Sequence, residues 1–527
     1  MKKIFLIAIL ISVSISAQKS VPLSFSLEKS SAQEFQSNLP ASNSIEDITV
    51  AGDTVVLATG KGVSISIDNG VTWNNLEDNE VFADDYVSRV AIYKGIIWAG
   101  LWHYEDGPDG KVATGGGLAY SSDLGENWTH IEQPLDDSLS NTVQYGNNTL
   151  RALAITVPQQ NLVYGIGLTS DAVWIASWSA GIRKSTDMGQ TWQRVVLPPD
   201  NLDEVHPEGT YNFNISPVPK ENFDESLNYI GRSVLAINDS TIICGTAGGV
   251  NISTDYGISW RKYNHTNQSN PISGNHIWNI KYNKYDNSLW LCSWRAQDSN
   301  EINASSRSTD LGNSWTTYLH DVRVYDVDFR NYFVDGVYSR SDIIAASDEG
   351  VFRSTDDGDS WILAPDIYDR NKEIEVKNKE MHATAVTQQT SGTATLFIGS
   401  QGGGLIKMIE SENAWDGDWE VFFVSGEDVS ESNSSFAFPN PFSPIQREVN
   451  IKYSLKQPAD VTIRILDFGM NLVKTIIQNA PRSANDVRIE HWDGRDESGS
   501  YVSNGVYFYR IDAGSNEPLF GKILVVK

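Results

Sequence analysis

The sequence predicts an all-β protein: a seven-bladed β-propeller followed by a small immunoglobulin-like β-sandwich. An eight-residue pattern, Ser-x-Asp-x-Gly-x-x-Trp, recurs six times between residues 66 and 361. Alternating apolar residues and glycine-rich turns precede each copy, and a second alternating region follows a polar stretch near residue 430. A two-residue hydrophobic period with glycine punctuation is typical of antiparallel strands joined by hairpins.

The first 17 residues have the composition of a secretory signal peptide. A basic start, Met1-Lys2-Lys3, precedes the apolar run Ile4–Ile11, and small residues lead to Ala17. This run is much shorter than the roughly 20 residues that span a bilayer. We therefore expect residues 1–17 to be a signal peptide, and an exported mature chain without a transmembrane segment.

The composition excludes some classes of protein. Asp and Glu number 67 against 40 Lys and Arg, a net charge of −27, which disfavours nucleic acid as a partner. Hydrophobic residues make up 40% of the chain, enough to exclude an intrinsically disordered protein. The two cysteines, Cys244 and Cys292, follow equivalent strands of neighbouring repeats, so we expect two separate buried thiols and no disulfide.

The repeated octapeptide is expected to be structural. Its Asp can accept hydrogen bonds from backbone N–H groups of its own turn, its Gly supplies a positive φ, and its Trp packs over the hairpin. We assign this role, and no metal site, to the following residues: Asp68, Gly70, Trp73, Asp123, Gly125, Trp128, Asp187, Gly189, Trp192, Asp255, Gly257, Trp260, Asp310, Gly312, Trp315, Asp356, Gly358 and Trp361.

A seventh unit lacks the octapeptide but keeps the strand–glycine–strand arrangement. It runs over Leu396–Lys407 and ends with the strand Trp419–Phe423. Seven such units, each of four short strands, predict a closed seven-bladed ring over residues 18–424, in which each blade covers the edge of the next.

The octapeptides resemble the Asp-box (BNR) repeat of sialidase-like propellers, xyloglucanases and sortilin-type receptors. The resemblance implies the propeller fold but no particular activity, because enzymes and non-enzymes share it. A sialidase would carry an Arg-Ile-Pro motif and three clamping arginines, yet the motif is absent and only Arg89 precedes Arg151 in the early propeller. A xyloglucanase would have two propellers and a catalytic pair of Asp residues.

One face of the propeller is the candidate binding face. Loops after the second strand and loops between blades share the face opposite the octapeptides, and the long segments Trp102–Gly117, Arg295–Arg307 and Gln193–Arg232 are expected to crowd it. Three second strands end in paired tryptophans, and the second member of each pair lies near the strand's end. The candidate ligand-binding residues are Trp102, His103, Tyr104, Trp178, Trp294 and Arg295.

Two alternatives for these residues stay open. The aromatic rings could instead fill gaps between blades and line the rim of the channel. In a separate glycine-rich loop, Asp106 and Asp109 could bind Ca²⁺, but they lack the regular EF-hand spacing, which favours a solvated loop. We assign no catalytic residue and no cofactor.

The C-terminal region has a different character. A polar linker, residues 425–436, precedes a module, residues 437–527, with six alternating strands. Its motifs resemble the Ig-like domain of flagellar hook-capping proteins, and still more the C-terminal sorting domains of type IX secretion substrates in Bacteroidota. The resemblance rests on Pro439, Asn440, Pro441, Trp492, Asp493, Gly494 and Gly505. An ordinary cell-surface Ig-like module is the alternative.

Together these features predict a non-catalytic, monomeric binding module, secreted or held on the outer cell surface. Its ligand would be an extracellular polysaccharide or protein, and its export would use the type IX machinery. An Asp-box glycoside hydrolase with paired carboxylates and a purely structural surface protein are the alternatives.

Overall fold

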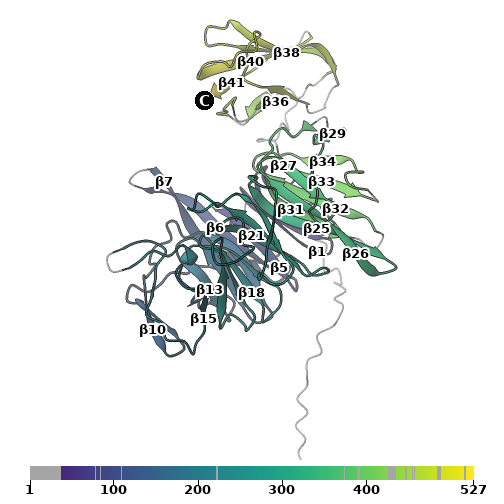
Figure 1. The fold of residues 1–527 in the computed structure, drawn as a ribbon. Helices are drawn as coiled ribbons and strands as arrows, with labels where there is room; N and C mark the ends of the chain where they lie inside the picture. The colour runs from purple at the N-terminus through teal and green to yellow at the C-terminus, as the bar shows by residue number, and fades with distance from the viewer. Residues whose placement is uncertain are drawn as a thin grey trace, which may run out of the picture. The chain divides into compact units, whose positions relative to one another are not determined.

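A computed structural model describes residues 37–527, except 77–78, 83–84, 108–109, 221–222, 373, 389–391, 412, 425–434, 439, 446–447, 454, 456, 484–487 and 515–517. The predicted signal peptide, most of the predicted linker, Asp109 and Pro439 lie outside the described residues. Within them the predicted fold class is confirmed: all-β, with seven four-stranded propeller blades and a C-terminal Ig-like module (Figure 1).

Each blade is an antiparallel sheet whose four core strands follow one another in sequence. Their bounds, blade by blade, are β1 Ile45–Ala51, β2 Thr54–Thr59, β3 Gly62–Ser66, β4 Asn74–Asn75; β5 Tyr86–Tyr93, β6 Ile96–Gly107, β7 Gly110–Ser121, β8 Thr129–Ile131; β11 Val163–Leu168, β12 Val173–Ser177, β13 Gly181–Ser185, β14 Gln193–Arg194; β17 Gly231–Ala236, β18 Ile242–Thr246, β19 Val250–Ser253, β20 Trp260–Tyr263; β21 His276–Asn283, β22 Ser288–Trp294, β23 Ala304–Ser308, β24 Thr316–Tyr318; β25 Val324–Val334, β26 Val337–Ser347, β27 Gly350–Ser354, β28 Ile362–Leu363; and β31 Met381–Gln388, β32 Ala394–Ser400, β33 Gly404–Glu410, β34 Trp419–Phe422.

The ring closes between blade 7 and blade 1 without an exchanged strand. Side chains of the two blades form one buried core that includes Ile45, Trp73 and Phe397. Next to this core, Asn69 donates to the hydroxyl of Thr395 at 2.6 Å. The backbone N–H groups of Gly402 and Gly404 also donate to the Asn43 carbonyl, at 3.0 Å and 2.9 Å. Closure therefore combines side-chain packing with a few backbone hydrogen bonds at this junction, without a shared four-stranded sheet.

The six octapeptides have the predicted local structure. In the first, the Asp68 carboxylate accepts from the Thr72 backbone N–H at 2.9 Å, and the Ser66 hydroxyl accepts from the Gly70 N–H at 2.8 Å. All six glycines have φ between 75° and 100°, which glycine adopts more easily than other residues. In four copies, the Trp indole N–H donates to the carbonyl of this glycine.

Every innermost strand begins with a β-bulge. The register between the first and second strands of each blade slips by one residue near the start of the first strand. The seven extra residues, in blade order, are Glu46, Ser88, Tyr164, Arg232, Trp278, Tyr325 and His382. A bulge changes the direction of a side chain and increases the local twist.

The segment expected to crowd the binding face, Gln193–Arg232, lies elsewhere, so that expectation is wrong. It contributes β15 (Glu204–Val205), which joins the sheet of blade 4, and β16 (Asn214–Ile215), which pairs with β10 (Asn148–Ala152) beside β9 (Thr142–Tyr145). The short 3₁₀ turn Leu227–Tyr229 follows.

The physical reason is burial. Val205 and Ile215 of this insertion share a core with Trp174 and Trp260 of blades 3 and 4. The insertion therefore covers the edges of blades 3 and 4. The strand β9, which shares a small sheet with β16 of the insertion, reaches the Asp-box side, where the Tyr145 hydroxyl donates to the carbonyl of Ile258.

Blade 2 also departs from expectation, because Trp102–Gly117 is not a loop. β6 and β7 continue as one long hairpin through most of this segment, which projects from the ring in Figure 1. Blade 6 has a comparable long hairpin, β25–β26, at its other end. A short hairpin, β29 (Tyr368–Asp369) and β30 (Ile374–Glu375), precedes blade 7.

The C-terminal module is a two-sheet sandwich around its own core, which includes Tyr453, Trp492 and Tyr509. One sheet holds β35 (Ser435–Phe438), β36 (Val449–Tyr453) and β39 (Arg488–Trp492). The other holds β38 (Leu472–Arg482), β37 (Ala459–Leu466), β40 (Gly505–Ala513) and β41 (Leu519–Val525). The six predicted strands are present, and β35 is an additional one.

Two further expectations are answered by the described residues. Cys244 and Cys292 are free and buried, as predicted, and burial raises the pKa of both thiols. No helix among the described residues has the length and apolar character needed to cross a membrane.

Candidate functional site

The strand registers establish which residues share a face. His276, at the start of β21, pairs with Trp294 at the end of β22, and Tyr86 pairs with Trp102. The Asp boxes instead follow the third strands, at the opposite end of the sheets. The bulges and the candidate tryptophans therefore lie on the same face, which we call the bulge face.

The structure divides the six predicted ligand-binding residues into two groups. Trp102 and Tyr104 join Tyr86 in an aromatic trio on blade 2. The Trp102 ring centroid lies 4.8 Å from that of Tyr86 and 5.0 Å from that of Tyr104. Tyr86 and Tyr104 are 38% and 49% exposed, so the trio offers ring surface to solvent.

The second group lies around the mouth of the central channel and contains Trp178 and Trp294. His276 lies between these two indoles, 6.3 Å from Trp178 and 6.1 Å from Trp294 by ring centroids. Trp278 stacks on Trp294 at 4.2 Å with an interplanar angle of 11°, and Tyr325 contacts both. We call this set the mouth cluster: Tyr164, Trp178, Arg232, His276, Trp278, Trp294, Tyr325 and His382.

Arg232 holds the mouth cluster together from its centre. Its guanidinium lies over three rings, at 4.5 Å from Tyr164, 4.5 Å from Trp178 and 4.6 Å from Trp278. Its Nε–H donates to His276 Nε2 at 2.7 Å. Burial lowers the pKa of Arg232 to about 10, so the group is still a cation at neutral pH.

His382 continues the cluster to the junction of blades 7 and 1. Its ring lies 4.5 Å from Tyr325, its Nδ1 3.2 Å from a Glu46 oxygen and its Nε2 3.5 Å from a Glu380 oxygen. Burial opposes protonation, but the hydrogen bond and charge of Glu46, with the charge of Glu380, outweigh it and raise the pKa of His382.

The two remaining predicted residues are engaged locally. His103 Nδ1 lies 2.7 Å from Asp85 and its Nε2 3.5 Å from Glu105, on the strand that carries Trp102. The side chain of Arg295 donates to the carbonyl of Asp298 in its own loop at 3.2 Å. Neither residue contributes to the mouth cluster.

Sequence reasoning missed the bulge residues, although a signal for them exists. In an unbroken strand, buried residues recur at every second position, but here they are three apart. Examples are Ile277 and Ile280, Val324 and Val327, and Ile45 and Ile48, with the bulge residue directly after the first of each pair. Such a three-residue spacing at each blade's first strand marks the ring of bulges.

Below the mouth, the channel holds a cavity of about 300 Å³ lined by β1, β5, β11, β17 and β21. Its charged groups are paired: Asp47 accepts from Arg89 at 3.2 Å, and Lys281 lies 3.2 Å from Asp326. Burial raises the pKa of Asp326 to about 6, with Lys281 opposing the shift. Asp326 also accepts from the Thr384 backbone N–H, which links blades 6 and 7.

Four acidic side chains of the bulge face lie beside histidines. Glu46 and Glu380 flank His382, and Asp85 and Glu105 flank His103. The general acid of a glycosidase needs a raised pKa. The pKa of Glu46 is instead lowered, because hydrogen bonds from His382 and Ser44 outweigh the effect of burial. That of Glu105 is lowered chiefly by a hydrogen bond from Gln159.

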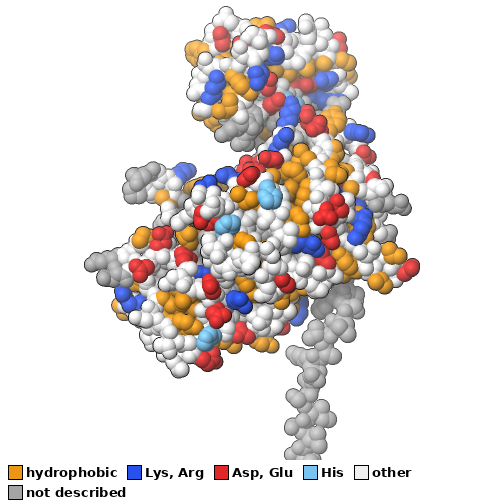
Figure 2. All heavy atoms as spheres, viewed as in Figure 1, with side chains coloured by type: hydrophobic (Ala, Val, Ile, Leu, Met, Phe, Trp, Pro, Cys, Tyr) orange, Lys and Arg blue, Asp and Glu red, His pale blue; other side chains and the backbone are white. Residues whose placement is uncertain are grey.

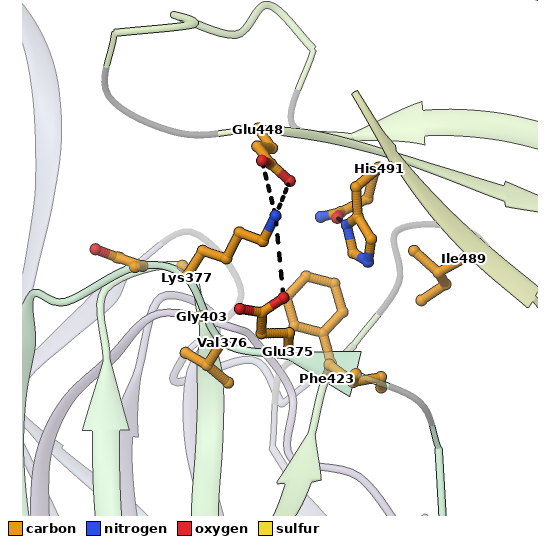
Figure 3. Close-up of a pocket in the computed structure, with 12 residues that line it drawn as sticks. Glu375, Val376, Lys377, Gly403, Phe423, Glu448, Ile489 and His491 are labelled. Atoms are coloured by element: carbon orange, nitrogen blue, oxygen red, sulfur yellow. Dashed lines mark hydrogen bonds and ion pairs between the residues drawn. The ribbon is translucent and has the colours of Figure 1, made fainter. Parts of the chain in front are cut away.

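A small cavity of about 80 Å³ is lined by residues of blade 7 and of the C-terminal module (Figure 3). Lys377 lies between two acids there, 2.8 Å from a Glu448 oxygen and 4.0 Å from a Glu375 oxygen. This volume accommodates a few water molecules. Among the described residues, no group of three or more His, Cys, Asp or Glu side chains is arranged to hold a metal ion.

Comparison with known proteins identifies the C-terminal module. Residues 444–517 match the family model of the FlgD Ig-like domain, which confirms the predicted resemblance to hook-capping proteins. No curated protein matches the chain.

Several solved structures are similar to the chain at low identity. PorZ, a surface component of the type IX secretion system of Porphyromonas gingivalis, is 12% identical with a TM-score of 0.36, covering 91% of this chain and 65% of PorZ. An ancestral GH74 enzyme is 12% identical with a TM-score of 0.49, covering 91% and 62%. YCF48 from Cyanidioschyzon merolae is 14% identical with a TM-score of 0.38, covering 70% and 95%. The matched regions span less than two thirds of the PorZ and GH74 chains.

Proposed function

We propose that this protein is an exported, non-catalytic binding module that holds an extracellular ligand on its bulge face. One observation carries the proposal: aromatic rings from blades 2, 3, 5, 6 and 7 gather on this face, while the opposite face is occupied by Asp-box turns. Half-exposed tryptophan and tyrosine rings provide large contact area at low cost in side-chain entropy. On this face the pKa values of Glu46 and Glu105 are lowered, whereas the general acid of a glycosidase needs a raised pKa.

Nucleic acid does not fit this proposal, because the net charge is −27. On the side of the molecule drawn in Figure 2, basic and acidic side chains are interspersed, without a continuous basic stripe. The candidate ligands are therefore extracellular polysaccharides or proteins.

The test uses the full chain and a panel of immobilised polymers: laminarin, xyloglucan and mannan as neutral polysaccharides, alginate as an acidic one, and collagen as a protein. We expect capture by one of them, and its loss in a triple variant, Trp102→Ala, Trp178→Ala and Trp294→Ala. Tyr256→Ala is the matched control, because Tyr256 is a 56% exposed aromatic residue of the Asp-box side. Capture that survives the triple variant, or no capture by any polymer, counts against the proposal.

We also propose that the C-terminal module directs type IX export to the cell surface or the medium. Support comes from the FlgD Ig-like match at residues 444–517 together with the signal-peptide-like N-terminus. Deleting residues 438–527 in a host with this secretion system should retain the protein in the periplasm, while Tyr256→Ala should be exported normally. Tryptophan fluorescence of the retained protein would show that its propeller is folded. Normal export of the folded, truncated chain would refute the sorting role.

A further inference from the structure

The contact between Arg232 and His276 fixes where the histidine proton lies. A guanidinium can only donate hydrogen bonds, so His276 Nε2, 2.7 Å from Arg232 Nε, must be the acceptor. His276 is therefore neutral and carries its proton on Nδ1. Burial and the neighbouring Arg232 charge lower its pKa to about 3, which agrees with this geometry.

The Nδ1–H of His276 is available to a ligand. It has no hydrogen-bond partner among the described residues, and it is not one of the buried polar atoms without a partner. The atom is therefore not fully enclosed by the described residues, and His276 is partly exposed on the bulge face. A half-buried donor of this kind is a ready partner for an oxygen atom of a ligand.

The two indoles beside His276 are held in place before any ligand arrives. The Trp294 N–H donates to the carbonyl of Val324 at 2.8 Å, and one face of the ring stacks on Trp278. Trp178 lies against the Arg232 guanidinium. Because these side chains are already ordered, little rotamer entropy remains to be lost on binding.

The charges around this site favour an uncharged ligand. The guanidinium of Arg232 is enclosed by three rings, and His276 is neutral. A second cation, Arg323, lies 5.8 Å from the Trp294 ring, but three acids surround the adjoining Tyr325 and His382: Glu46, Glu380 and Asp348. The whole chain has a net charge of −27. A polyanion would meet net repulsion here, whereas a neutral sugar presents C–H faces to indoles and hydroxyl oxygens to a donor.

We propose that Trp178, His276 and Trp294 form a subsite for a neutral polysaccharide, in which a sugar ring contacts the indoles and a hydroxyl oxygen accepts from His276 Nδ1–H. The inference rests on the proposed binding function and adds its ligand class and its polar contact. It is independent of the aromatic trio on blade 2.

The test replaces His276 by glutamine or by asparagine, whose side-chain amides lie at different distances from the backbone. The amide of His276→Gln occupies the Nε2 position and can still accept from Arg232, but the Nδ1 donor is lost. The amide nitrogen of His276→Asn restores a donor near Nδ1. We expect affinity for the captured neutral polysaccharide, measured by calorimetry with the full chain, to fall roughly five- to tenfold in His276→Gln, with partial rescue in His276→Asn.

Controls separate binding from folding. His206→Gln changes an exposed histidine of the insertion and should leave affinity unchanged. Trp178→Phe keeps an aromatic ring and should weaken binding less than Trp178→Ala. Selective ¹⁵N labelling of histidine, with His276→Gln to assign the signal, should show the Nδ1-protonated tautomer.

Distinct results overturn the inference and the proposed function. Capture by alginate or collagen alone would leave a binding module but refute the neutral-sugar subsite. Unchanged affinity in both folded His276→Gln and Trp178→Ala, with loss in Trp102→Ala, would move the site to blade 2. An Nε2-protonated His276 would refute the donor assignment directly.

Discussion

Replacing the box glycine of blade 4, Gly257, by alanine tests whether the Asp boxes join neighbouring blades by close packing. An alanine Cβ at this position would lie 2.2 Å from Cη2 of Trp174, on the adjacent blade. Trp174 is 1% exposed and Lys184 Nζ lies 4.6 Å from its ring, so the indole has little room to move. The residue's φ of +80° adds backbone strain.

Two contributions determine how much Gly257→Ala lowers the free energy of unfolding. A left-handed backbone costs a non-glycine residue about 1–2 kcal/mol, and overpacking a filled core costs about 1–3 kcal/mol. We therefore expect Gly257→Ala to lower the free energy of unfolding by roughly 2–5 kcal/mol.

Two other glycines separate these contributions. Gly52 has φ +62° and nothing within 4 Å of the added Cβ, so Gly52→Ala measures the backbone strain alone. Gly189 has φ +81° with its nearest contact at 3.3 Å, and should be intermediate. The difference between Gly257→Ala and Gly52→Ala should be roughly 1–3 kcal/mol.

Urea unfolding followed by tryptophan fluorescence is a suitable assay, because Trp492 alone of the 16 tryptophans lies beyond residue 437. The signal therefore reports on the propeller. If Gly257→Ala unfolds at the same urea concentration as Gly52→Ala, the box does not depend on this contact and the reasoning fails.

Three further predictions concern charge and thiols. The pKa of His382 is higher in the folded protein than in the unfolded chain. The ion pair with Glu46 therefore stabilises the fold fully below the unfolded pKa of about 6.5, and this stabilisation is lost as pH rises through the folded pKa. The melting temperature of wild type should exceed that of His382→Gln by less at alkaline pH; a difference that stays constant with pH would contradict this. Arg353 is 1% exposed and pairs with Asp342 and Glu410 at 2.6 Å each, and Arg340 and Arg330 are the second partners of these two acids. Arg353→Met should destabilise the protein by about 1.5–3 kcal/mol in urea unfolding, because each buried carboxylate loses one of its two arginine partners; a loss below about 1 kcal/mol would be inconsistent with this. Cys244 and Cys292 should react with a thiol reagent only after denaturation, and a reductant should leave the melting temperature unchanged; rapid labelling of the native protein would contradict their burial.

Local sequence patterns were sufficient to predict the propeller blades. The Asp box is a self-contained turn, since Asp68, Ser66 and Gly70 complete its hydrogen bonds within eight residues. The first members of two tryptophan pairs, Trp98 and Trp174, are each 1% exposed, because they lie deeper in their strands than Trp102 and Trp178.

The mouth cluster could not be predicted from local patterns, because its members come together only in the tertiary structure. Arg232 and Trp278 meet only because bulges on two different blades bring them together. The sequence pattern assigns no role to Trp278 and marks Arg232 only as the end of a long connecting segment. The separation of Trp102 from Trp178 and Trp294 likewise depends on blade order around the ring, which no local motif encodes.

The route by which the ring closes has a consequence for the mature protein. Every blade, including the last, takes its four core strands from consecutive sequence ending at Phe422, and none of the described strands after that point enters a blade. Proteolytic removal of the C-terminal module at the cell surface would therefore break no propeller sheet. A propeller released in this way would present the same tryptophans as one that stays attached to the cell. The two forms would then have the same binding surface and would differ only in how far from the cell they can bind a ligand.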